Sequence, residues 1–304
     1  MKSKHLIDKA RSLARPYCIT KGADFKLKDH DPADTNGFSP DNKARAKEVL
    51  KLGVELMAEF QDVLYAQDRW AVLLIFQAMD AAGKDGVIKH VMSGINPQGC
   101  QVVSFKSPST EDLEHDYMWR CLKHLPERGR IGIFNRSYYE ETLVVRIHPE
   151  FLDKQKIPPS LLGKNIWKQR YEDIRNIEQY LSHNGVVIRK FFLNVSKKEQ
   201  KKRFLDRLDK PEKNWKFSAS DAQEREHWDD YMEAYEDTIR NTASKEAPWY
   251  IVPADNKWYT RMIVSSAVIE TLASLNLHYP KVGKEQLAGL EEARKQLEGG
   301  KGRK

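Results

Sequence analysis

The sequence has few of the features that take a chain into or across a membrane. Its longest apolar run, 70–76, is much shorter than the ~20 residues that a membrane-spanning helix needs, and no apolar signal segment stands near the first residue. Cysteine is scarce too: Cys18, Cys100 and Cys121 are widely spaced and odd in number, which is not the pattern of a disulfide framework. These absences predict a cytoplasmic protein with ordinary thiols and no membrane partner.

Internal repeats and low-complexity stretches are also absent from the 304 residues, of which 40% are hydrophobic. That content is enough for one large buried core, so we expect a single domain over 1–304 with an α/β core over 44–280. The polar segment 1–43 is expected to wrap this core as an irregular arm. The charged segment 281–304 is expected to be a helix followed by a solvated tail.

Positive charge is in excess, with a formal net charge of +7. This excess favours a polyanionic partner, but by itself it does not separate a nucleic acid, a membrane surface and a phosphate-rich small molecule. The charge is densest in 197–217, where nine Lys or Arg residues stand against four Asp or Glu residues. Such a run is either a solvated surface or a basic element that closes over a bound polyanion.

One segment carries the pattern of a phosphate-binding loop. The run 71–76 is apolar and short, which predicts a buried central strand, and from Lys84 onward apolar residues recur at helical spacing. A helix that begins at a loop directs its first N–H groups into that loop, so the loop can bind an anion. The pattern GxxxxGK[ST] keeps Gly83-Lys84 but has Ala78 for the first glycine and Asp85 for the hydroxyl residue. The alternative is an ordinary strand-to-helix turn with an exposed lysine.

Two polar groups near this loop are candidates for holding a metal ion. The missing hydroxyl residue would normally bind Mg²⁺, and Asp80 inside the loop is a carboxylate that can replace it. Asn135-Arg136 directly follows a predicted strand, 131–134. Because ligands bind at the carboxyl ends of parallel strands, this pair is expected to face Lys84, with Asn135 on the metal and Arg136 on phosphate oxygens. The alternative is a helix start capped by Asn135.

Strand and helix signals alternate along the rest of the chain, which predicts an α/β fold with a parallel sheet and flanking helices. The basic segment follows the fourth strand and is predicted to form a helical lid over 196–226, with Arg203 and Arg207 four residues apart on one face. A helix through Trp119 and Arg120 is also expected. The predicted strands are 71–76, 101–105, 131–134, 186–193 and 249–252, and the predicted long helices are 44–67, 165–182, 259–275 and 285–298.

Four motifs, in this order and spacing, resemble the type-2 polyphosphate kinase family: QAMDAAGKDG, SFKSPS, FNRSYYEETLVVRIHPE and KNWKFS. The resemblance covers roughly 44–275 and is far more specific than the loop alone. It implies a P-loop kinase-like fold similar to thymidylate kinase, and Mg²⁺-dependent phosphoryl transfer between inorganic polyphosphate and nucleotides. Chains with FNRSYYEE in this place resemble the subgroup that phosphorylates both AMP and ADP. Adenine nucleotides, with guanine nucleotides as a further option, and a homo-oligomer (dimer or tetramer) are also implied, and no nucleic acid is.

Carried over residue by residue, the resemblance implies that Asp80 binds a metal ion and helps to orient the nucleotide phosphate. It implies that Lys84 holds the transferring phosphoryl group. Arg136 would bridge donor and acceptor, and Asn135, where many members have Asp, would be the other metal ligand. The residues implied to bind polyphosphate are Ala81, Ala82, Gly83, Lys84, Asp85, Gly86, Lys89, Arg203, Arg207, Lys213 and Lys216. The residues implied to bind the nucleotide are Lys106, Arg120, Asn135, Arg136, Ser137, Tyr138 and Glu141.

Two other functions fit parts of the sequence. An ATP-dependent nucleoside monophosphate kinase would share the fold, and ATP as sole donor distinguishes it from a polyphosphate-dependent enzyme. A non-catalytic protein that binds a polyanion or nucleic acid would use the basic segment alone. Substitution of Lys84 separates this last option, because binding would barely change if the loop had no part in it.

Overall fold

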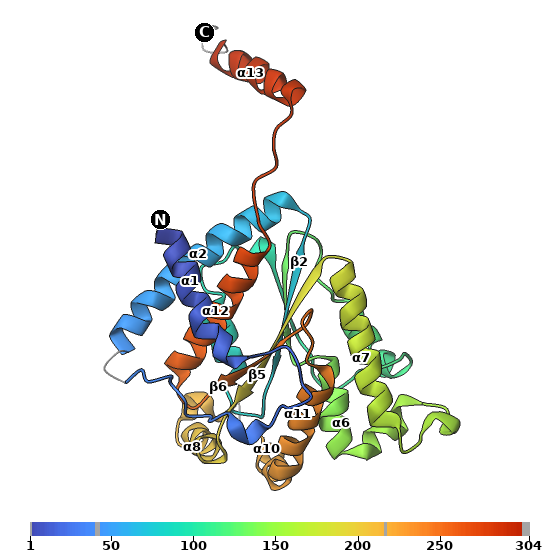
Figure 1. The fold of residues 1–304 in the computed structure, drawn as a ribbon. Helices are drawn as coiled ribbons and strands as arrows, with labels where there is room; N and C mark the ends of the chain where they lie inside the picture. The colour runs from blue at the N-terminus through green and yellow to red at the C-terminus, as the bar shows by residue number, and fades with distance from the viewer. Residues whose placement is uncertain (1, 40–42, 216–217, 300–304) are drawn as a thin grey trace.

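A six-stranded sheet forms the centre of the fold (Figure 1). The structure is a computed structural model and describes residues 2–39, 43–215 and 218–299. Every residue of the strand β2 (Ala71–Gln77) is buried, as its apolar sequence predicts. This strand lies between β4 (Ile131–Asn135) and β5 (Val186–Asn194) and runs parallel to both. The predicted phosphate-binding loop therefore leaves the sheet from a central strand.

The strand order is β1-β6-β5-β2-β4-β3, in which β2 to β6 are parallel. The other strands are β1 (Cys18–Ile19), β3 (Cys100–Ser104) and β6 (Trp249–Pro253). The five predicted strands and their parallel arrangement are confirmed, with each end within one residue of its predicted position. Phe76 of β2 pairs with Asn135 of β4, so the polar residues that follow these strands lie side by side.

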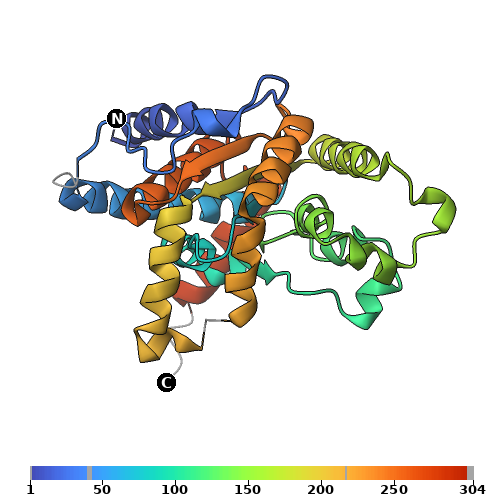
Figure 2. The same cartoon turned by 90° about the horizontal axis from the view of Figure 1, so that it is seen from below.

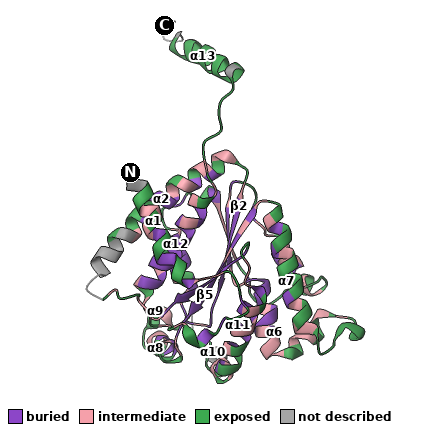
Figure 3. Ribbon diagram, in the orientation of Figure 1, coloured by how far each residue is buried: buried purple, intermediate pink, exposed green. Residues whose placement is uncertain are grey.

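Two groups of helices flank the sheet (Figures 1 and 2). In one group, α12 (Lys257–Ser274) packs against α1 (Lys2–Ala14), α2 (Lys43–Gln67) and α3 (Lys84–Val91). In the other, α7 (Ile166–His183) packs against α11 (Trp228–Thr242). Purple strands in Figure 3 mark the buried core between helices whose outer sides are exposed. None of the described helices has the length and apolar character needed to cross a membrane.

Shorter helices complete the described part of the chain. In Figure 2, α8 (yellow) and α11 (orange) project in the same direction beyond the sheet. The helix at the C-terminal end, α13, lies away from the rest of the chain, and all of its described side chains are exposed (Figures 1 and 3). The remaining α-helices are α4 (Thr110–Leu113), α5 (Trp119–Leu122), α6 (Val144–Ile147), α8 (Lys197–Leu208), α9 (Pro211–Asn214), α10 (Ala219–Glu224) and α13 (Lys284–Gly299).

The expectation of an irregular arm over 1–43 was wrong. The segment contains α1, whose Ala10, Leu13 and Ala14 are buried, and β1, which pairs antiparallel with β6. The hydroxyl groups of Tyr17 and Tyr259 are hydrogen-bonded to each other at 2.8 Å. The segment is therefore part of the core and extends the sheet by an edge strand.

Two helix predictions differ from the structure, and one long helix was not predicted. The helix expected through Trp119 and Arg120 is divided into α4 and α5, because the Ser109 side chain caps α4 and the chain turns again before α5. The helix that follows the phosphate loop ends at Val91, earlier than its apolar spacing suggests. The long helix α11 was not predicted at all.

Candidate active site

The loop 78–83 joins β2 to α3 in a conformation suited to an anion. Ala81 has φ +61° and Gly83 has φ +108°, so both lie in the left-handed region that favours glycine. Turns of this kind bring successive N–H groups to one side of the chain, and the first N–H groups of α3 have no partner within the helix. The strand, loop and helix that the sequence predicts are all present.

Lys84 lies inside this loop and is not an exposed lysine on an ordinary turn. Only 9% of the residue is exposed, and Nζ donates a hydrogen bond of 2.6 Å to the carbonyl oxygen of Ala78. Burial lowers the pKa of Lys84 to about 8, and the charge of Arg136 lowers it as well, although nearby carboxylates act in the opposite direction. The ammonium group is thus held in the loop without an ion-pair partner of its own among the described residues.

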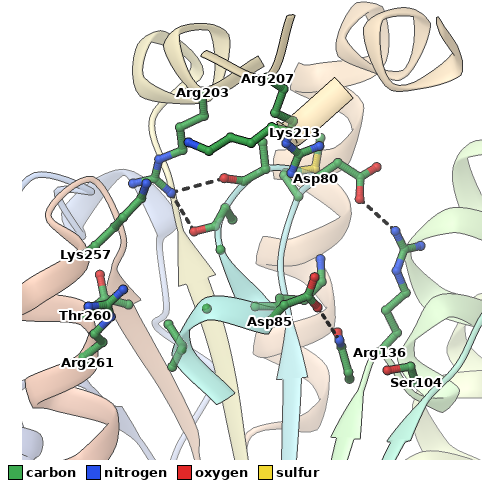
Figure 4. A pocket seen from close by; sticks show the side chains of 18 of the residues that line it. Asp80, Asp85, Ser104, Arg136, Arg203, Arg207, Lys213, Lys257, Thr260 and Arg261 are labelled. Carbon is green, nitrogen blue, oxygen red and sulfur yellow. Dashed lines mark hydrogen bonds and ion pairs between the residues drawn. The ribbon is translucent and has the colours of Figure 1, made fainter. Parts of the chain in front are cut away.

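Asp80 and Arg136 meet across the crevice between the ends of β2 and β4 (Figure 4). Arg136 Nη2 donates to Asp80 Oδ1 at 2.8 Å, and Nη1 donates to Glu140 Oε2 at 3.1 Å. Arg136 has φ +65°, and its backbone N–H donates to the carbonyl oxygen of Phe76. The two carboxylates hold a partly exposed guanidinium at the point where the sequence predicts contact with phosphate oxygens.

Asn135 faces the start of α3. Its Nδ2 donates to Asp85 Oδ1 at 2.8 Å, which Figure 4 shows as the lower dashed line. Asp85 stands where a phosphate-binding loop ordinarily has a hydroxyl residue, and Asn135 stands where many family members have Asp. The two unusual residues are in direct contact with each other. The alternative of Asn135 as a helix cap has no support, because Ser137 caps the 3-10 helix Tyr138–Thr142.

A cavity of about 540 Å³ lies over the loop. It is lined by eight Lys or Arg residues and three Asp residues, an excess of five positive charges, and Phe105 is the one aromatic side chain among its described lining residues. The predicted site residues that line it are Asp80, Ala81, Ala82, Gly83, Lys84, Asp85, Gly86, Lys106, Asn135, Arg136, Arg203, Arg207 and Lys213.

Sequence reasoning missed the α12 side of this cavity. Lys257, Thr260 and Arg261, at the start of α12, line it opposite Arg136, and Figure 4 shows them below Arg203. Burial lowers the pKa of Lys257, and the charges of neighbouring cations add to the effect. The signal was present in the sequence, because a Lys and an Arg four residues apart follow the last predicted strand.

Several predicted site residues lie elsewhere. Lys89 is exposed on α3, and Arg120 Nη2 donates to the carbonyl oxygen of Lys106, so Arg120 supports a cavity residue without lining the cavity. Ser137, Tyr138 and Glu141 are buried and have partners in the core. In this structure the last three side chains face the core and do not line the cavity, so their contact with a nucleotide stays a prediction. Lys216 lies outside the described residues.

Tyr138 belongs to a buried polar network beneath the end of β4. The hydroxyl groups of Tyr138 and Tyr139 donate to Glu178 Oε1 at 2.9 and 2.8 Å. Lys190 Nζ donates to Glu178 Oε2 at 2.6 Å and to the carbonyl oxygen of Thr242 at 2.8 Å. Lys190 is fully buried, and the ion pair compensates the burial of both charges.

The donors that could hold a divalent cation are few. Among the described residues, no group of three or more His, Cys, Asp or Glu side chains could enclose a metal ion. The cavity nevertheless holds the carboxylates of Asp80 and Asp85. Mg²⁺ characteristically takes one or two carboxylates and completes its shell with water and substrate phosphates, so this donor set fits Mg²⁺ better than an ion that needs an all-protein cage.

Known proteins share both the sequence and the fold. An ADP-polyphosphate phosphotransferase of Rhodopseudomonas palustris is 56% identical over 258 residues, which cover 84% of this chain and 89% of that protein. An AMP/ADP-polyphosphate phosphotransferase of Meiothermus ruber is 42% identical over 267 residues, which cover 88% and 96% of the two chains.

The crystal structure of polyphosphate kinase 2 from Arthrobacter aurescens TC1 is similar to the described fold. The TM-score is 0.82 at 38% sequence identity, over 91% of this chain and 95% of that chain. The family model of polyphosphate kinase 2 (PPK2) matches residues 39–280, which include the loop, the cavity and the basic helix α8. The chain therefore belongs to the polyphosphate kinase 2 family.

Proposed function

We propose that this protein transfers the terminal phosphoryl group of inorganic polyphosphate to AMP and to ADP, with Mg²⁺. The observation that carries the proposal is the cavity over the phosphate loop, with its excess of five positive charges and its single aromatic lining residue, Phe105. One aromatic surface suits one nucleobase, so the other substrate is expected to be a polyanion without a base. Two similar proteins are named ADP-polyphosphate phosphotransferase and AMP/ADP-polyphosphate phosphotransferase, and this similarity supports the same substrates.

On the donor side, the N–H groups of the loop 81–86 and the ammonium of Lys84 would hold the terminal phosphates. The rest of the polyphosphate would pass between α8 and α12, where four further cations line the cavity. A linear polyanion needs spaced cations along its length and little shape recognition, and this wall of the cavity meets that requirement. The four cations are Arg207, Lys213, Lys257 and Arg261.

On the acceptor side, the nucleotide phosphate would lie against Arg136, and its base would lie near Phe105. Both residues directly follow adjacent parallel strands, β4 and β3, whose carboxyl ends open into the cavity. Lys106 lines the same wall and is braced through its carbonyl oxygen by Arg120. Arg136 reaches toward the loop through Asp80, so it stands between the two proposed substrate positions.

Asp80, with Asp85 or Asn135, would hold Mg²⁺. When bound, the ion supplies neutralisation of charge on the phosphate oxygens. Asp80 also fixes one arm of Arg136 through the 2.8 Å hydrogen bond, while Glu140 fixes the other arm. Loss of Asp80 is therefore expected to affect both the metal and the orientation of Arg136.

The transfer itself asks little covalent chemistry of the protein. A phosphate oxygen of AMP attacks the terminal phosphorus of polyphosphate, a new P–O bond forms as the bond to the next phosphate breaks, and the shortened chain leaves with the electron pair and its negative charge. Lys84 and Arg136 would stabilise charge on the transferring group, and α8 with α9 would exclude water. The products are ADP and a chain one phosphate shorter, and ADP can enter the same cycle as acceptor.

The test is an assay with AMP, Mg²⁺ and long-chain polyphosphate and no other phosphoryl donor. Appearance of ADP and then ATP supports the proposal. Turnover of AMP only when ATP replaces polyphosphate would make the protein a nucleoside monophosphate kinase. Polyphosphate binding without product, unchanged by Lys84→Ala, would make it a binding protein in which the loop has no part.

A further inference from the structure

Three consecutive carbonyl groups of the phosphate loop are bonded by side chains from a single turn of α8. Gln200 Nε2 donates to the carbonyl oxygen of Asp80 at 2.9 Å. Arg203 Nη1 donates to those of Ala81 and Ala82 at 3.2 and 2.6 Å (Figure 4). Both side chains belong to buried residues, with 1% of Gln200 and 6% of Arg203 exposed. The loop is thus held along its length from one side.

The remaining donors of Arg203 are used in the same way. Nη2 donates to the carbonyl oxygens of Ala254 and Asp255, at 2.6 and 3.1 Å, and Nε donates to Glu199 Oε1 at 3.0 Å. A guanidinium group has five N–H donors, and these bonds together with the two to the loop number five. The protein itself therefore occupies every donor of Arg203, and a phosphate could bind there only by displacing a carbonyl group.

The peptide geometry turns this bonding pattern into an orientation of the loop. In a trans peptide the C=O and N–H groups point in opposite directions, so carbonyl groups drawn toward α8 send the following N–H groups away from it. The N–H of Ala82 donates to the carbonyl oxygen of Met79, which leaves those of Ala81 and Gly83 for a ligand. Ala81 has φ +61°, a conformation that is unfavourable for an L-residue and therefore needs outside support.

From these contacts we infer that Arg203, together with Gln200, is a positioning residue that holds the phosphate loop in its anion-binding conformation and does not itself bind polyphosphate. The family resemblance implied that Arg203 binds polyphosphate, and its contacts in the structure indicate this different role. The inference rests on the proposed function only for the identity of the anion.

The same contacts tie the loop to the base of the lid. Arg225, near the far end of 196–226, donates from Nη1 to Gln200 Oε1 at 2.7 Å and to the carbonyl oxygen of Lys197 at 3.1 Å. The two ends of the lid are therefore hydrogen-bonded to each other at Gln200, which also bonds the loop. Arg203 also joins the loop to the end of β6 through Ala254, so one side chain fixes the relative positions of loop, lid base and sheet edge.

The test distinguishes a positioning role from a phosphate contact by the salt dependence of KM for polyphosphate. We compare Arg203→Ala, Arg203→Lys and Gln200→Ala with Lys257→Ala, which removes a cation next to Arg203 that lines the same cavity. The measurements are kcat, KM for polyphosphate between about 50 and 200 mM salt, and the melting curve. A cation that binds phosphate releases counterions, so its removal flattens the dependence of log KM on log salt, whereas removal of a positioning residue does not.

Arg203→Ala is expected to lower kcat about a hundredfold, the size of effect that a displaced reacting group produces, with an unchanged salt slope. Arg203→Lys should behave like Arg203→Ala, because an ammonium cannot bond two pairs of carbonyl groups. Lys257→Ala should flatten the salt slope. Wild-type kcat in Arg203→Lys, or a slope in Arg203→Ala as flat as in Lys257→Ala, overturns the inference.

Gln200→Ala removes no charge and keeps the inference testable if Arg203→Ala does not fold. A lowered kcat at unchanged salt slope in Gln200→Ala supports it, and wild-type kcat in that variant overturns it. Failure of the proposed function is seen separately, as absence of polyphosphate turnover in the wild type. In that event calorimetric titration with tripolyphosphate decides: weakened binding with an unchanged salt slope in Arg203→Ala supports the positioning role, and unchanged affinity overturns it.

Discussion

Alkaline pH should remove the charge of Lys84 and so weaken the use of polyphosphate. Burial brings the pKa of Lys84 from its ordinary value of 10.5 to about 8, which corresponds to about 3 kcal/mol by which the folded protein disfavours the charged form. Because the folded pKa is lowered, the ammonium is present below pH 8 and is lost as pH rises through that value. At pH 9 about a tenth of the molecules keep the charge, so kcat/KM should be about tenfold below its plateau.

Bound phosphates should raise this pKa again, because an anion next to the ammonium favours its charged form. The alkaline decrease in kcat reports the pKa in the enzyme–substrate complex, and the decrease in kcat/KM reports the pKa in the free enzyme. The decrease in kcat should therefore occur at higher pH than the decrease in kcat/KM. Binding of polyphosphate near pH 8.5 should also take up about three quarters of a proton per site, because about a quarter of the free molecules already carry the charge at that pH. Ionisation of AMP and polyphosphate does not contribute to the pH dependence between pH 8 and pH 9, because phosphate groups have a second pKa of about 6 and are already ionised.

The assay is steady-state kinetics with AMP and polyphosphate from about pH 7 to pH 10, with calorimetry in two buffers of different ionisation enthalpy to count the protons taken up. The matched control is Lys84→Arg, which keeps a positive charge throughout this range. This variant should be slow, since it cannot repeat the short bond to Ala78, but its kcat/KM should show no limb near pH 8. A flat profile to pH 9.5 in the wild type, or the same limb in Lys84→Arg, would refute the assignment.

Three further outcomes are expected. Asp80→Asn should lower kcat about a hundredfold or more with a near-normal melting curve, because it removes a proposed metal ligand and weakens the hydrogen bond that orients Arg136; near-normal turnover would remove Asp80 from the mechanism. Asn135→Asp places a carboxylate against that of Asp85, so it should tighten Mg²⁺ binding and shift the ratio of kcat/KM values toward AMP, since ADP carries about one more negative charge; an unchanged ratio would exclude charge at this position as the cause of acceptor range. Lys190→Met should destabilise the protein by about 3–5 kcal/mol in urea denaturation, since Glu178 would remain buried without its partner, and a loss below 1 kcal/mol would contradict the importance of the pair.

The parts of the fold that could be predicted are those whose signal is local. A buried parallel strand is a short apolar run, and the run 71–76 predicted β2 to within one residue. The helix α11 carried a weaker signal of the same kind. Its buried face consists of Trp, Tyr and Thr as well as aliphatic residues, and these types do not stand out as an apolar stripe in sequence. The edge strand β1 is only two residues long, and its existence depends on pairing with β6, more than two hundred residues later.

The candidate site was predictable where residue type decides the role and was not where orientation decides it. Gly83-Lys84 and Asp80 form a recognisable loop whatever surrounds them. Arg203 and Arg207 are the same residue type on the same helix, four residues apart, and no local pattern distinguishes them. In the structure Arg203 is buried against backbone carbonyl groups, which identifies it as a part of the scaffold. That distinction depends on where the loop passes the helix, and no local pattern records it.

Residue type and orientation also have separate effects at the end of β4, where neighbouring residues face either the cavity or the core. Asn135 and Arg136 point into the cavity, while Tyr138 and Tyr139 point back and donate to Glu178 in the core. Arg136 has φ +65°, which is unfavourable for an L-residue, and it keeps this conformation because the residues after it are fixed by buried hydrogen bonds. The motif that surrounds these residues therefore contains both the layer expected to touch the ligand and the layer that supports it. Adjacent positions in the chain carry both, so only their directions in space distinguish Arg136, which lines the cavity, from Tyr138, which bonds Glu178 in the core.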